Sequence, residues 1–325
     1  MKQGKIIIAG AGSIGTALGN VLAVRSDLDI RLLSIETDVV ESINNNGVNS
    51  RYFPGIKLHP RLKAIEEKAK VSEAQAVFFA VPSVAVKEVA DDLKKYLNPD
   101  ALLVNLAKGY GNGSKTVAEI LNSSFSNPVA SFKGPAFARE LINNSPTGFT
   151  VGSNNDDVFD FFKEIMPGTT IHLDFSGDLR GVELISILKN IYAIAMGIVD
   201  AHFDSTNLRF MVFTRAFNEI RLLMKILGGQ EETMYRYCGI GDFGLTALND
   251  LSRNRTLGLL IGKGFFTESI SDKVVLEGKM AIRIIGKEIT DKNESLDKVP
   301  IFRELLKIFS EPYNLTLFVN NILKD

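Results

Sequence analysis

Lys189 and Asn190 interrupt an almost wholly apolar stretch, LISILKNIYAIAMGIV, which runs from residue 184 to residue 199. A helix that is apolar on all faces is normally buried, and lysine is rarely buried without a partner. The chain therefore needs a reason to place an ammonium here, which makes Lys189 a candidate functional residue. The alternative is a structural ion pair, for which Glu183 and Asp242 are possible partners.

Three further positions place polar side chains beside apolar segments. In NLAKGYG, Lys108 directly follows an apolar run, and residues just past the carboxyl end of a parallel strand face the ligand crevice. CGIGDFGLT surrounds Asp242 with glycines and apolar residues, and LSRNRTLG places Ser252, Arg253 and Asn254 at the start of a helical run. Each has a simpler interpretation as a solvent-exposed lysine, a turn cap or a surface arginine. Together with the motif described next, they favour one shared site.

The segment GAGSIG, residues 10–15, has the glycine spacing of a dinucleotide-binding loop. A strand-like run, KIIIA, ends just before it and a helix-like run continues it, which is the context that such a loop requires. Gly10 would permit the tight turn, Gly12 the approach of a pyrophosphate, and Gly15 close packing of helix on strand. Glu36 closes the next strand-like run and would accept hydrogen bonds from the ribose hydroxyls. The alternative is a glycine turn in an α/β protein that binds no cofactor.

The hydrophobic pattern predicts the elements that position these residues. Apolar runs predict strands at 5–9, 29–34, 75–82, 101–107, 128–132 and 148–152, with helical patterns at 84–96 and 114–121. Helices alone are expected afterwards, at 179–200, 206–227, 273–289 and 300–310, with a glycine-rich passage at 239–264. We therefore predict a doubly wound α/β domain over residues 1–177 and an all-helical domain over 178–325. Ligand sites favour such domain junctions.

Charge and cysteine content narrow the function class. The 325 residues carry a formal net charge of −1, so no overall basic field favours nucleic acid or an anionic membrane as a partner. Cys238 is the single cysteine, which excludes an internal disulfide and any multi-cysteine metal site. The N-terminus lacks the apolar core of a secretory signal, and we expect no membrane span. These features predict a cytoplasmic protein.

A set of motifs resembles one enzyme family along nearly the whole chain. In order they are GAGSIGTAL, RYFPGI, AVPS, AKG, KGPAFARE, VELISILKNIYAIAMGI, GIGD, SRN and VVLEG. Their combination resembles NAD(P)-dependent glycerol-3-phosphate dehydrogenase, which interconverts sn-glycerol 3-phosphate and dihydroxyacetone phosphate. The resemblance implies an N-terminal Rossmann domain, a helical domain like that of 6-phosphogluconate dehydrogenase, a homodimer, and a place in glycerophospholipid metabolism.

The resemblance also implies site residues by position, and no metal ion. Lys189 matches the proton-transfer lysine, with Asn190, Asp242 and Lys108 as its catalytic neighbours. Substrate contacts are implied at Lys108, Gly134, Ala136, Asp242, Thr246, Ser252, Arg253 and Asn254. Cofactor contacts are implied at Gly10, Gly12, Ser13, Ile14, Gly15, Glu36, Lys108, Ala138, Arg253, Val275 and Glu277.

Several positions depart from the family pattern. Ala136 stands where the family has a hydroxyl residue, Ile14 replaces an aromatic residue, and Phe243 follows GIGD in place of the usual continuation. DSTNLRF, residues 204–210, replaces a small glycine-containing passage. No charged catalytic position is lost. Ala136 and the altered passage 204–210 leave open a catalytically weak NAD-binding regulator. A related hydroxy-acid or ketopantoate-type reductase is a second alternative, because it shares the two-domain plan and a lysine in the helical domain.

The segment after the second predicted strand suggests which dinucleotide is used. It reads LLSIETD, and no Arg or Lys follows Arg31 until Arg51. The carboxylate of Glu36 would meet the 2′-phosphate of NADP as a like charge, and Arg31 is expected to point away because it lies inside the strand. We therefore expect NAD as the cofactor, with NADP accepted less well, and a preference for NADH of at least about tenfold in kcat/KM.

Overall fold

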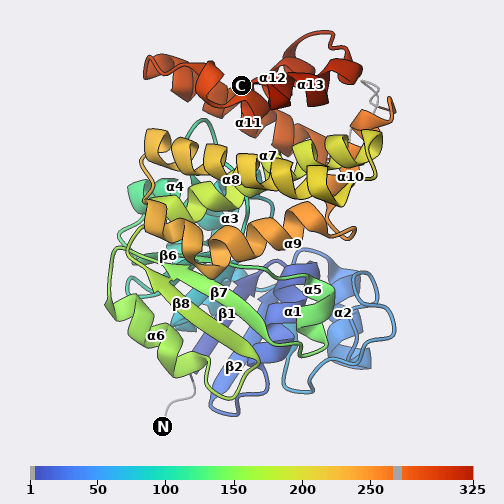
Figure 1. The fold of residues 1–325 in the computed structure, drawn as a ribbon. Coiled ribbons are helices and arrows are strands. Elements are labelled where there is room, and N and C mark those ends of the chain that lie inside the picture. Colours follow the sequence, from blue (N-terminus) through green and yellow to red (C-terminus); the bar gives the residue numbers. More distant parts are fainter. Residues whose placement is uncertain (1–3, 266–272, 325) are drawn as a thin grey trace. The chain divides into compact units, whose positions relative to one another are not determined.

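The computed structural model describes residues 4–265 and 273–324, with the backbone alone at 273–276 (Figure 1). The chain divides into two compact units, Met1–Glu183 and Leu184–Asp325. The expected domain boundary after residue 177 lies slightly earlier than this division. The long helix α7 (Leu179–His202) begins in the first unit and continues into the second.

The first unit is built on one eight-stranded sheet with the order β3-β2-β1-β4-β5-β6-β7-β8. Its strands are β1 (Gly4–Ala9), β2 (Leu28–Leu33), β3 (Lys63–Ile65), β4 (Ala76–Phe79), β5 (Leu102–Asn105), β6 (Val129–Lys133), β7 (Thr147–Gly152) and β8 (Ile171–Ser176). Neighbouring strands are parallel except β6 and β7, which pair antiparallel. The six strands predicted from apolar runs are confirmed, and the expected doubly wound sheet is present. β3 and β8 were not predicted.

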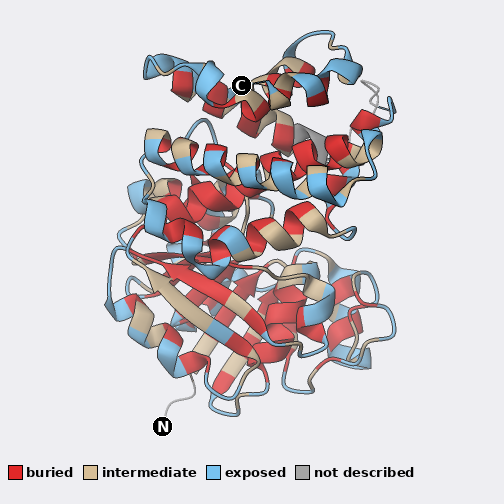
Figure 2. Cartoon of the chain, viewed as in Figure 1, coloured by how far each residue is buried: buried red, intermediate tan, exposed pale blue. Residues whose placement is uncertain are grey.

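Helices cover both faces of this sheet. They are α1 (Ser13–Leu22), α2 (Thr37–Asn46), α3 (Val86–Leu93), α4 (Val117–Ser124), α5 (Ala138–Ile142) and α6 (Asp157–Ile165), with short turns η1 (Lys68–Glu73), η2 (Ser83–Ala85) and η3 (Lys94–Tyr96). Along β1, Ile6 and Ile8 join one buried cluster and Ile7 and Ala9 join the other. Successive side chains of a strand point to opposite faces, so an unbroken apolar run serves two cores. Figure 2 shows the strand β7 coloured mostly as buried.

The described part of the second unit contains helices and no strand, as predicted. After α7 these are α8 (Thr206–Leu227), α9 (Asp242–Leu248), α10 (Arg253–Gly262), α11 (Lys273–Asp291), α12 (Pro300–Ser310) and α13 (Phe318–Leu323), with short turns η4 (Glu231–Tyr235), η5 (Tyr237–Gly241), η6 (Leu296–Lys298) and η7 (Leu315–Leu317). Helix α8 ends at Leu227, where the range 206–227 predicted its end, and the C-cap Gly228 has a left-handed φ of 86°. Gly258 brings α10 close to α7, because a Cβ there would lie 2.0 Å from Ile194 O.

Helix α7 is long and apolar enough to span a bilayer, with a mean hydropathy of 1.7 over its best window. In the structure 94% of that window is buried. Lys189 and Glu183 both lie in this helix, and each is buried beside a partner of opposite charge. These properties are those of a core helix in a soluble protein rather than of a lipid-facing helix.

Candidate functional site

The glycine loop between β1 and α1 has the conformation that a dinucleotide requires. Gly10 has φ 113°, and a Cβ there would lie 2.7 Å from Ala80 O. A Cβ on Gly15 would lie 2.1 Å from Gly10 O, so only glycine permits this turn. Gly12 is the N-cap of α1, and no atom lies within 4 Å of the position its Cβ would occupy. The open backbone at this helix N-terminus fits a pyrophosphate.

Two further residues of the loop, Ser13 and Ile14, belong to the first turn of α1. Ile14 packs against the buried cluster on one face of the sheet. The departure from an aromatic residue at this position therefore adds to the core of the first unit. Ser13 is exposed at the end of the helix that faces the expected phosphates.

Glu36 lies at the same edge of the sheet as the glycine loop. β1 and β2 pair in parallel with Ala9 opposite Leu33, and Gly10 N donates to Leu33 O. Glu36 is the N-cap of α2, and its backbone N–H donates to Ser34 Oγ. Arg31 is held by Asp29, 2.6 Å away, so it does not serve this end of the strand. The structure thus brings Glu36 to the sheet edge that carries the glycine loop, and its contact with a ribose stays a prediction.

Arg51 also reaches this place, which the sequence analysis did not foresee. Its guanidinium lies 2.7 Å from Glu36 Oε1, and the hydroxyl of Tyr52 lies 3.4 and 3.3 Å from the two oxygens of Glu36. In the sequence, Arg51 is the first Arg or Lys after Arg31. The fold brings its guanidinium into contact with the carboxylate of Glu36.

Lys108 lies directly beyond β5, as expected, and its Nζ donates to Gly134 O at 3.0 Å. Gly134 follows β6 and has no room for a side chain, since a Cβ would lie 2.1 Å from Gly148 O. Ala136 and Ala138, further along the same connection, both pack against the sheet core. The methyl group at position 136 therefore has a packing role where the family has a hydroxyl.

Lys133 and Glu183 form a buried ion pair that the sequence analysis missed. Lys133 Nζ lies 3.1 Å from Glu183 Oε1, with both side chains no more than 1% exposed. Lys133 also donates to the carbonyls of Asn105 and Ala107, at 3.0 and 2.5 Å. Glu183 accepts from the side chains of Asn105 and Ser131. Lys133 could have been found by the criterion that selected Lys108, because it is also a lysine at the end of an apolar strand.

Lys189 is buried in the second unit and forms an ion pair with Asp242. Its Nζ lies 2.7 Å from Asp242 Oδ1 and 2.7 Å from Thr246 Oγ1. Asp242 is the first residue of α9 and Thr246 lies one turn later, so both face the same side of that helix. Of the two carboxylates considered as partners for Lys189, Glu183 pairs with Lys133 instead. Asn190, the next residue of α7, is half-buried.

Helix α9 is held in place by an aromatic contact. Phe243 is fully buried and stacks on Phe213 of α8, with ring centroids 4.5 Å apart and planes within 12°. The departure at this position therefore fixes the element that carries Asp242. Asp242 and Phe243 are neighbours in sequence, so their side chains point in different directions from α9.

Ser252, Arg253 and Asn254 form the beginning of α10. Ser252 is the N-cap, and its Oγ accepts from Arg255 N. Arg253 is exposed and Asn254 half-buried, whereas Arg255 is buried and pairs with Asp200 at 2.7 Å. The structure thus separates the two arginines of SRNR: Arg255 is buried in an ion pair, whereas Arg253 is exposed, and its contact with the substrate stays a prediction.

The passage 204–210, another departure from the family, has a structural role. Ser205 is the N-cap of α8 and accepts from Leu208 N. Arg209 Nε donates to Asp200 Oδ1 at 2.7 Å, so Asp200 receives both Arg209 and Arg255.

Glu277 lies in α11 and is half-buried. Val275 belongs to the first turn of the same helix, and its side chain lies outside the described residues. The segment VVLEG is therefore helical from Lys273 onward. Both expected cofactor contacts stay predictions.

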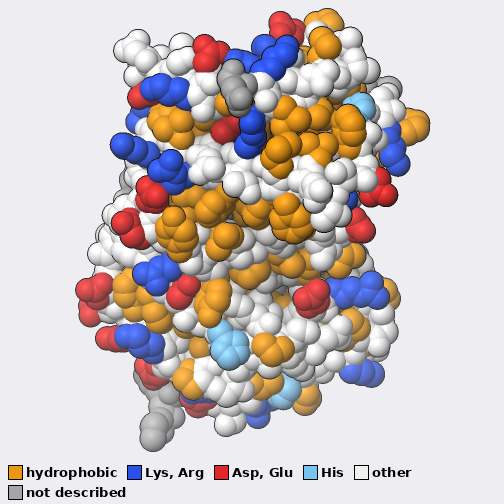
Figure 3. Space-filling view, in the orientation of Figure 1, with side chains coloured by type: hydrophobic (Ala, Val, Ile, Leu, Met, Phe, Trp, Pro, Cys, Tyr) orange, Lys and Arg blue, Asp and Glu red, His pale blue; other side chains and the backbone are white. Residues whose placement is uncertain are grey.

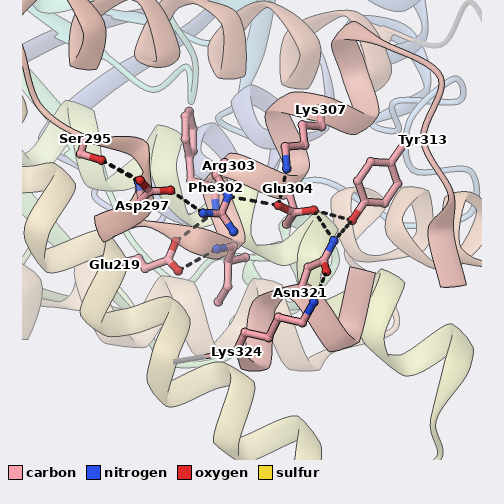
Figure 4. Close-up of polar contacts among 11 residues, drawn as sticks. Glu219, Ser295, Asp297, Phe302, Arg303, Glu304, Lys307, Tyr313, Asn321 and Lys324 are labelled. Carbon is pink, nitrogen blue, oxygen red and sulfur yellow. Dashed lines mark hydrogen bonds and ion pairs between the residues drawn. The ribbon is translucent and has the colours of Figure 1, made fainter. Parts of the chain in front are cut away.

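A second group of buried carboxylates lies among the C-terminal helices (Figure 4). Glu219 of α8 accepts from the backbone N–H groups of Ile301 and Phe302, at the start of α12, and from Tyr192. Burial raises the pKa of Glu219 to about 7. Glu304 is also buried, but its pKa is lowered to about 2, because Tyr313, Lys307, Asn321 and Arg303 donate hydrogen bonds to it and outweigh its burial.

Comparison with known proteins identifies relatives of the whole chain. Family models described as the N-terminus and the C-terminus of NAD-dependent glycerol-3-phosphate dehydrogenase match residues 5–159 and 178–320. A protein of Methanothermobacter thermautotrophicus named glycerol-3-phosphate dehydrogenase, NAD(P)+, is 35% identical over 320 residues, which cover 97% of this chain and 96% of the relative. One of Coxiella burnetii with the same name is 36% identical over 261 residues, 80% of this chain and 78% of the relative.

Solved structures agree with these matches. The crystal structure of the Coxiella burnetii glycerol-3-phosphate dehydrogenase matches with a TM-score of 0.88 at 30% identity, and the match covers 100% of both chains. A ketopantoate reductase of Ralstonia eutropha matches with a TM-score of 0.59 at 15% identity, with 98% of this chain and 100% of that chain covered. The second likeness shows a shared fold and nothing more.

Proposed function

We propose that Lys189 is the general acid–base of the reaction that this protein catalyses. The chain belongs to the NAD-dependent glycerol-3-phosphate dehydrogenase family. The protein is an oxidoreductase that interconverts sn-glycerol 3-phosphate and dihydroxyacetone phosphate with a nicotinamide cofactor. The observation that supports the assignment is the buried Lys189 ammonium, held 2.7 Å from both Asp242 and Thr246.

The reaction requires transfer of a proton to or from the C2 oxygen of the substrate. When bound, the cofactor supplies or accepts the hydride at C2 of the substrate. During reduction, negative charge develops on the C2 oxygen, and Lys189 as an ammonium stabilises it and donates the proton. During oxidation, Lys189 as a neutral amine accepts the proton of the C2 hydroxyl. Asp242 and Thr246 fix the position of Nζ, and we assign Asn190 to the same group because it matches the family.

Substrate binding is assigned to two sets of residues. Arg253, with Asn254 and Thr246, would hold the phosphate, because a guanidinium matches phosphate oxygens in geometry and charge. The exposed position of Arg253 at the start of α10 supports this role. Lys108, Gly134 and Ser252 complete the contacts that the family resemblance implies. Ala136 would contact the substrate through its methyl group alone.

Cofactor binding is assigned to the loop Gly10–Gly15 and to Glu36. The backbone cradle at Gly12 and the carboxylate at the end of β2 fit the pyrophosphate and the ribose of NAD. Lys108, Ala138, Arg253, Val275 and Glu277 complete the proposed contacts. We propose NAD as the preferred cofactor.

The decisive experiment measures NADH oxidation by the purified protein with dihydroxyacetone phosphate, dihydroxyacetone and ketopantoate in parallel. We expect turnover with the phosphorylated ketone and weak or no turnover with the other two. Turnover of ketopantoate alone would favour the ketopantoate-type reductase. Binding of NADH without turnover of any ketone would favour the regulator.

We also propose that the protein is a cytoplasmic homodimer. Phe203, Phe210 and Met211, around the start of α8, are 47%, 53% and 44% exposed. Figure 3 shows hydrophobic side chains gathered over this part of the helical unit. Large exposed apolar patches mark interaction surfaces, and light scattering on a size-exclusion column would measure the mass.

A further inference from the structure

We propose that Arg51 is a specificity-determining residue that binds the 2′-phosphate of NADP. The proposal rests on the proposed cofactor site and deepens it. It starts from the ion pair between Arg51 and Glu36, whose guanidinium nitrogen and carboxylate oxygen lie 2.7 Å apart. Exposed ion pairs often contribute little to stability, so the position of this one needs a separate explanation.

The segment that carries Arg51 is tied to the glycine loop. Asn49 is fully buried, and its Nδ2 donates to Ala11 O and to Thr16 Oγ1, both at 2.9 Å. The same residue closes a turn, because Phe53 N donates to Asn49 O and Tyr52 N to Asn49 Oδ1. The residues that surround the pyrophosphate cradle therefore also fix the place of Arg51.

Tyr52 completes the arrangement around Glu36. Its hydroxyl lies within hydrogen-bond distance of both carboxylate oxygens, and its ring lies 5.9 Å from the guanidinium carbon of Arg51. Glu36 is thus held by a phenol and a cation on a turn that the glycine loop anchors. One carboxylate and one guanidinium therefore lie together beyond the end of β2.

These two charges suit the two dinucleotides differently. The hydroxyls of the NAD ribose donate to Glu36, and Arg51 can stay in its ion pair. The 2′-phosphate of NADP repels the carboxylate of Glu36, whereas the guanidinium of Arg51 can bind this phosphate by donating paired hydrogen bonds to its oxygens. The side chain of Arg51 is 55% exposed, so it is accessible to a phosphate. Glu36 then sets the preference for NAD, and Arg51 limits how strongly NADP is excluded.

The test measures equilibrium binding rather than turnover. Binding of NADH and NADPH is followed by nicotinamide fluorescence, and binding of adenosine 2′,5′-bisphosphate and of AMP by calorimetry. We expect Arg51→Gln to weaken NADPH and adenosine 2′,5′-bisphosphate at least about tenfold, and NADH and AMP by no more than about threefold. Arg31→Gln is the matched control, since it removes the same charge from β2 but from a residue paired with Asp29.

A double variant separates direct contact from simple neutralisation of Glu36. If Arg51 binds the phosphate, Arg51→Gln still weakens NADPH selectively when Glu36 is already Gln. Loss of the effect in that background would overturn the proposal, as would equal weakening of both cofactors by Arg51→Gln alone. A separate assay of ketone reduction on the same samples would show failure of the dehydrogenase assignment independently of the binding results.

Discussion

Lys189 Nζ lies 2.7 Å from Asp242 Oδ1, and the two side chains are only 3% and 1% exposed. Taking two charges out of water costs several kcal/mol each, and such pairs are often no more stabilising than apolar residues of the same size. Stability therefore does not explain why the pair is here. The general acid–base role that we propose for Lys189 would explain it, because that role needs an ammonium held at a fixed place.

Lys189→Ala is expected to lower turnover by about 10²–10⁴-fold, the usual share of a positioned acid–base group. NADH binding, followed by fluorescence, should change little. Lys189→Met retains most of the side-chain volume and tests whether packing or the proton matters. Near-normal turnover in either variant would mean that Lys189 is structural.

Arg253→Ala should weaken the phosphorylated substrate selectively, at a cost of about 2–5 kcal/mol if the contact is desolvated. The preference for dihydroxyacetone phosphate over dihydroxyacetone, measured as a ratio of kcat/KM values, should shrink. Arg221→Ala is a suitable control, because Arg221 is another exposed arginine of the same unit. An unchanged ratio in Arg253→Ala would place the phosphate elsewhere, with Lys108 as the next residue to test.

Much of the fold could be predicted because a long apolar run must be buried, and its length and periodicity indicate whether it forms a strand or a helix. Helix α8 was expected at 206–227 and is found there, with its stop at Gly228. The strands that were missed, β3 and β8, lie at the two edges of the sheet. β3 has three residues and β8 alternates polar with apolar side chains, so neither resembles a strand buried on both faces.

The candidate site was less predictable where it depends on tertiary contacts. Arg253 and Arg255 are indistinguishable in the string SRNR, and only the phase of α10 shows that Arg255 is the buried one. Arg51 is distant from Glu36 in sequence, and the hydrogen bond from Asn49 to Ala11 brings its turn to the glycine loop. Local spacing carries no information about such a bond.

Wild-type protein should prefer NADH over NADPH by at least about tenfold in kcat/KM, which corresponds to ~1.4 kcal/mol. The reason is the carboxylate of Glu36, which accepts ribose hydroxyls and repels a phosphate. Glu36→Gln should narrow the difference mainly by admitting NADPH. Steady-state kinetics with both cofactors give the ratio, and equal use by the wild type would remove Glu36 from the ribose site.

Lys133→Met should destabilise the protein by about 3–5 kcal/mol, because it removes the positive charge 3.1 Å from the buried carboxylate of Glu183. Lys133→Met combined with Glu183→Gln removes both charges and should recover most of the loss. Urea denaturation followed by circular dichroism measures both variants. A double variant no more stable than Lys133→Met would show that the charge of Glu183 is not the cause.

Glu219 should make the stability of the helical unit depend on pH in a window set by its pKa of about 7. The carboxyl group of Glu219 binds its proton more tightly in the folded protein than in the unfolded protein, where its pKa has the ordinary value of about 4.5. Its favourable contribution is therefore fully present below about pH 4.5 and is lost as the pH rises through 7, a change of about 3 kcal/mol.

Glu219→Gln cannot titrate, so the stability of the wild type relative to this variant should fall between pH 4.5 and pH 8. Glu304 does not obscure the comparison. Its pKa is lowered to about 2, so its stabilising contribution is fully present above pH 4.5 and is lost only as the pH falls toward 2. Figure 4 shows both carboxylates near the same helix, Glu219 beside its start and Glu304 within it. Urea denaturation at several pH values measures the difference. A difference that is constant with pH would mean that Glu219 is ionised in the folded protein throughout, held by the N–H groups of Ile301 and Phe302.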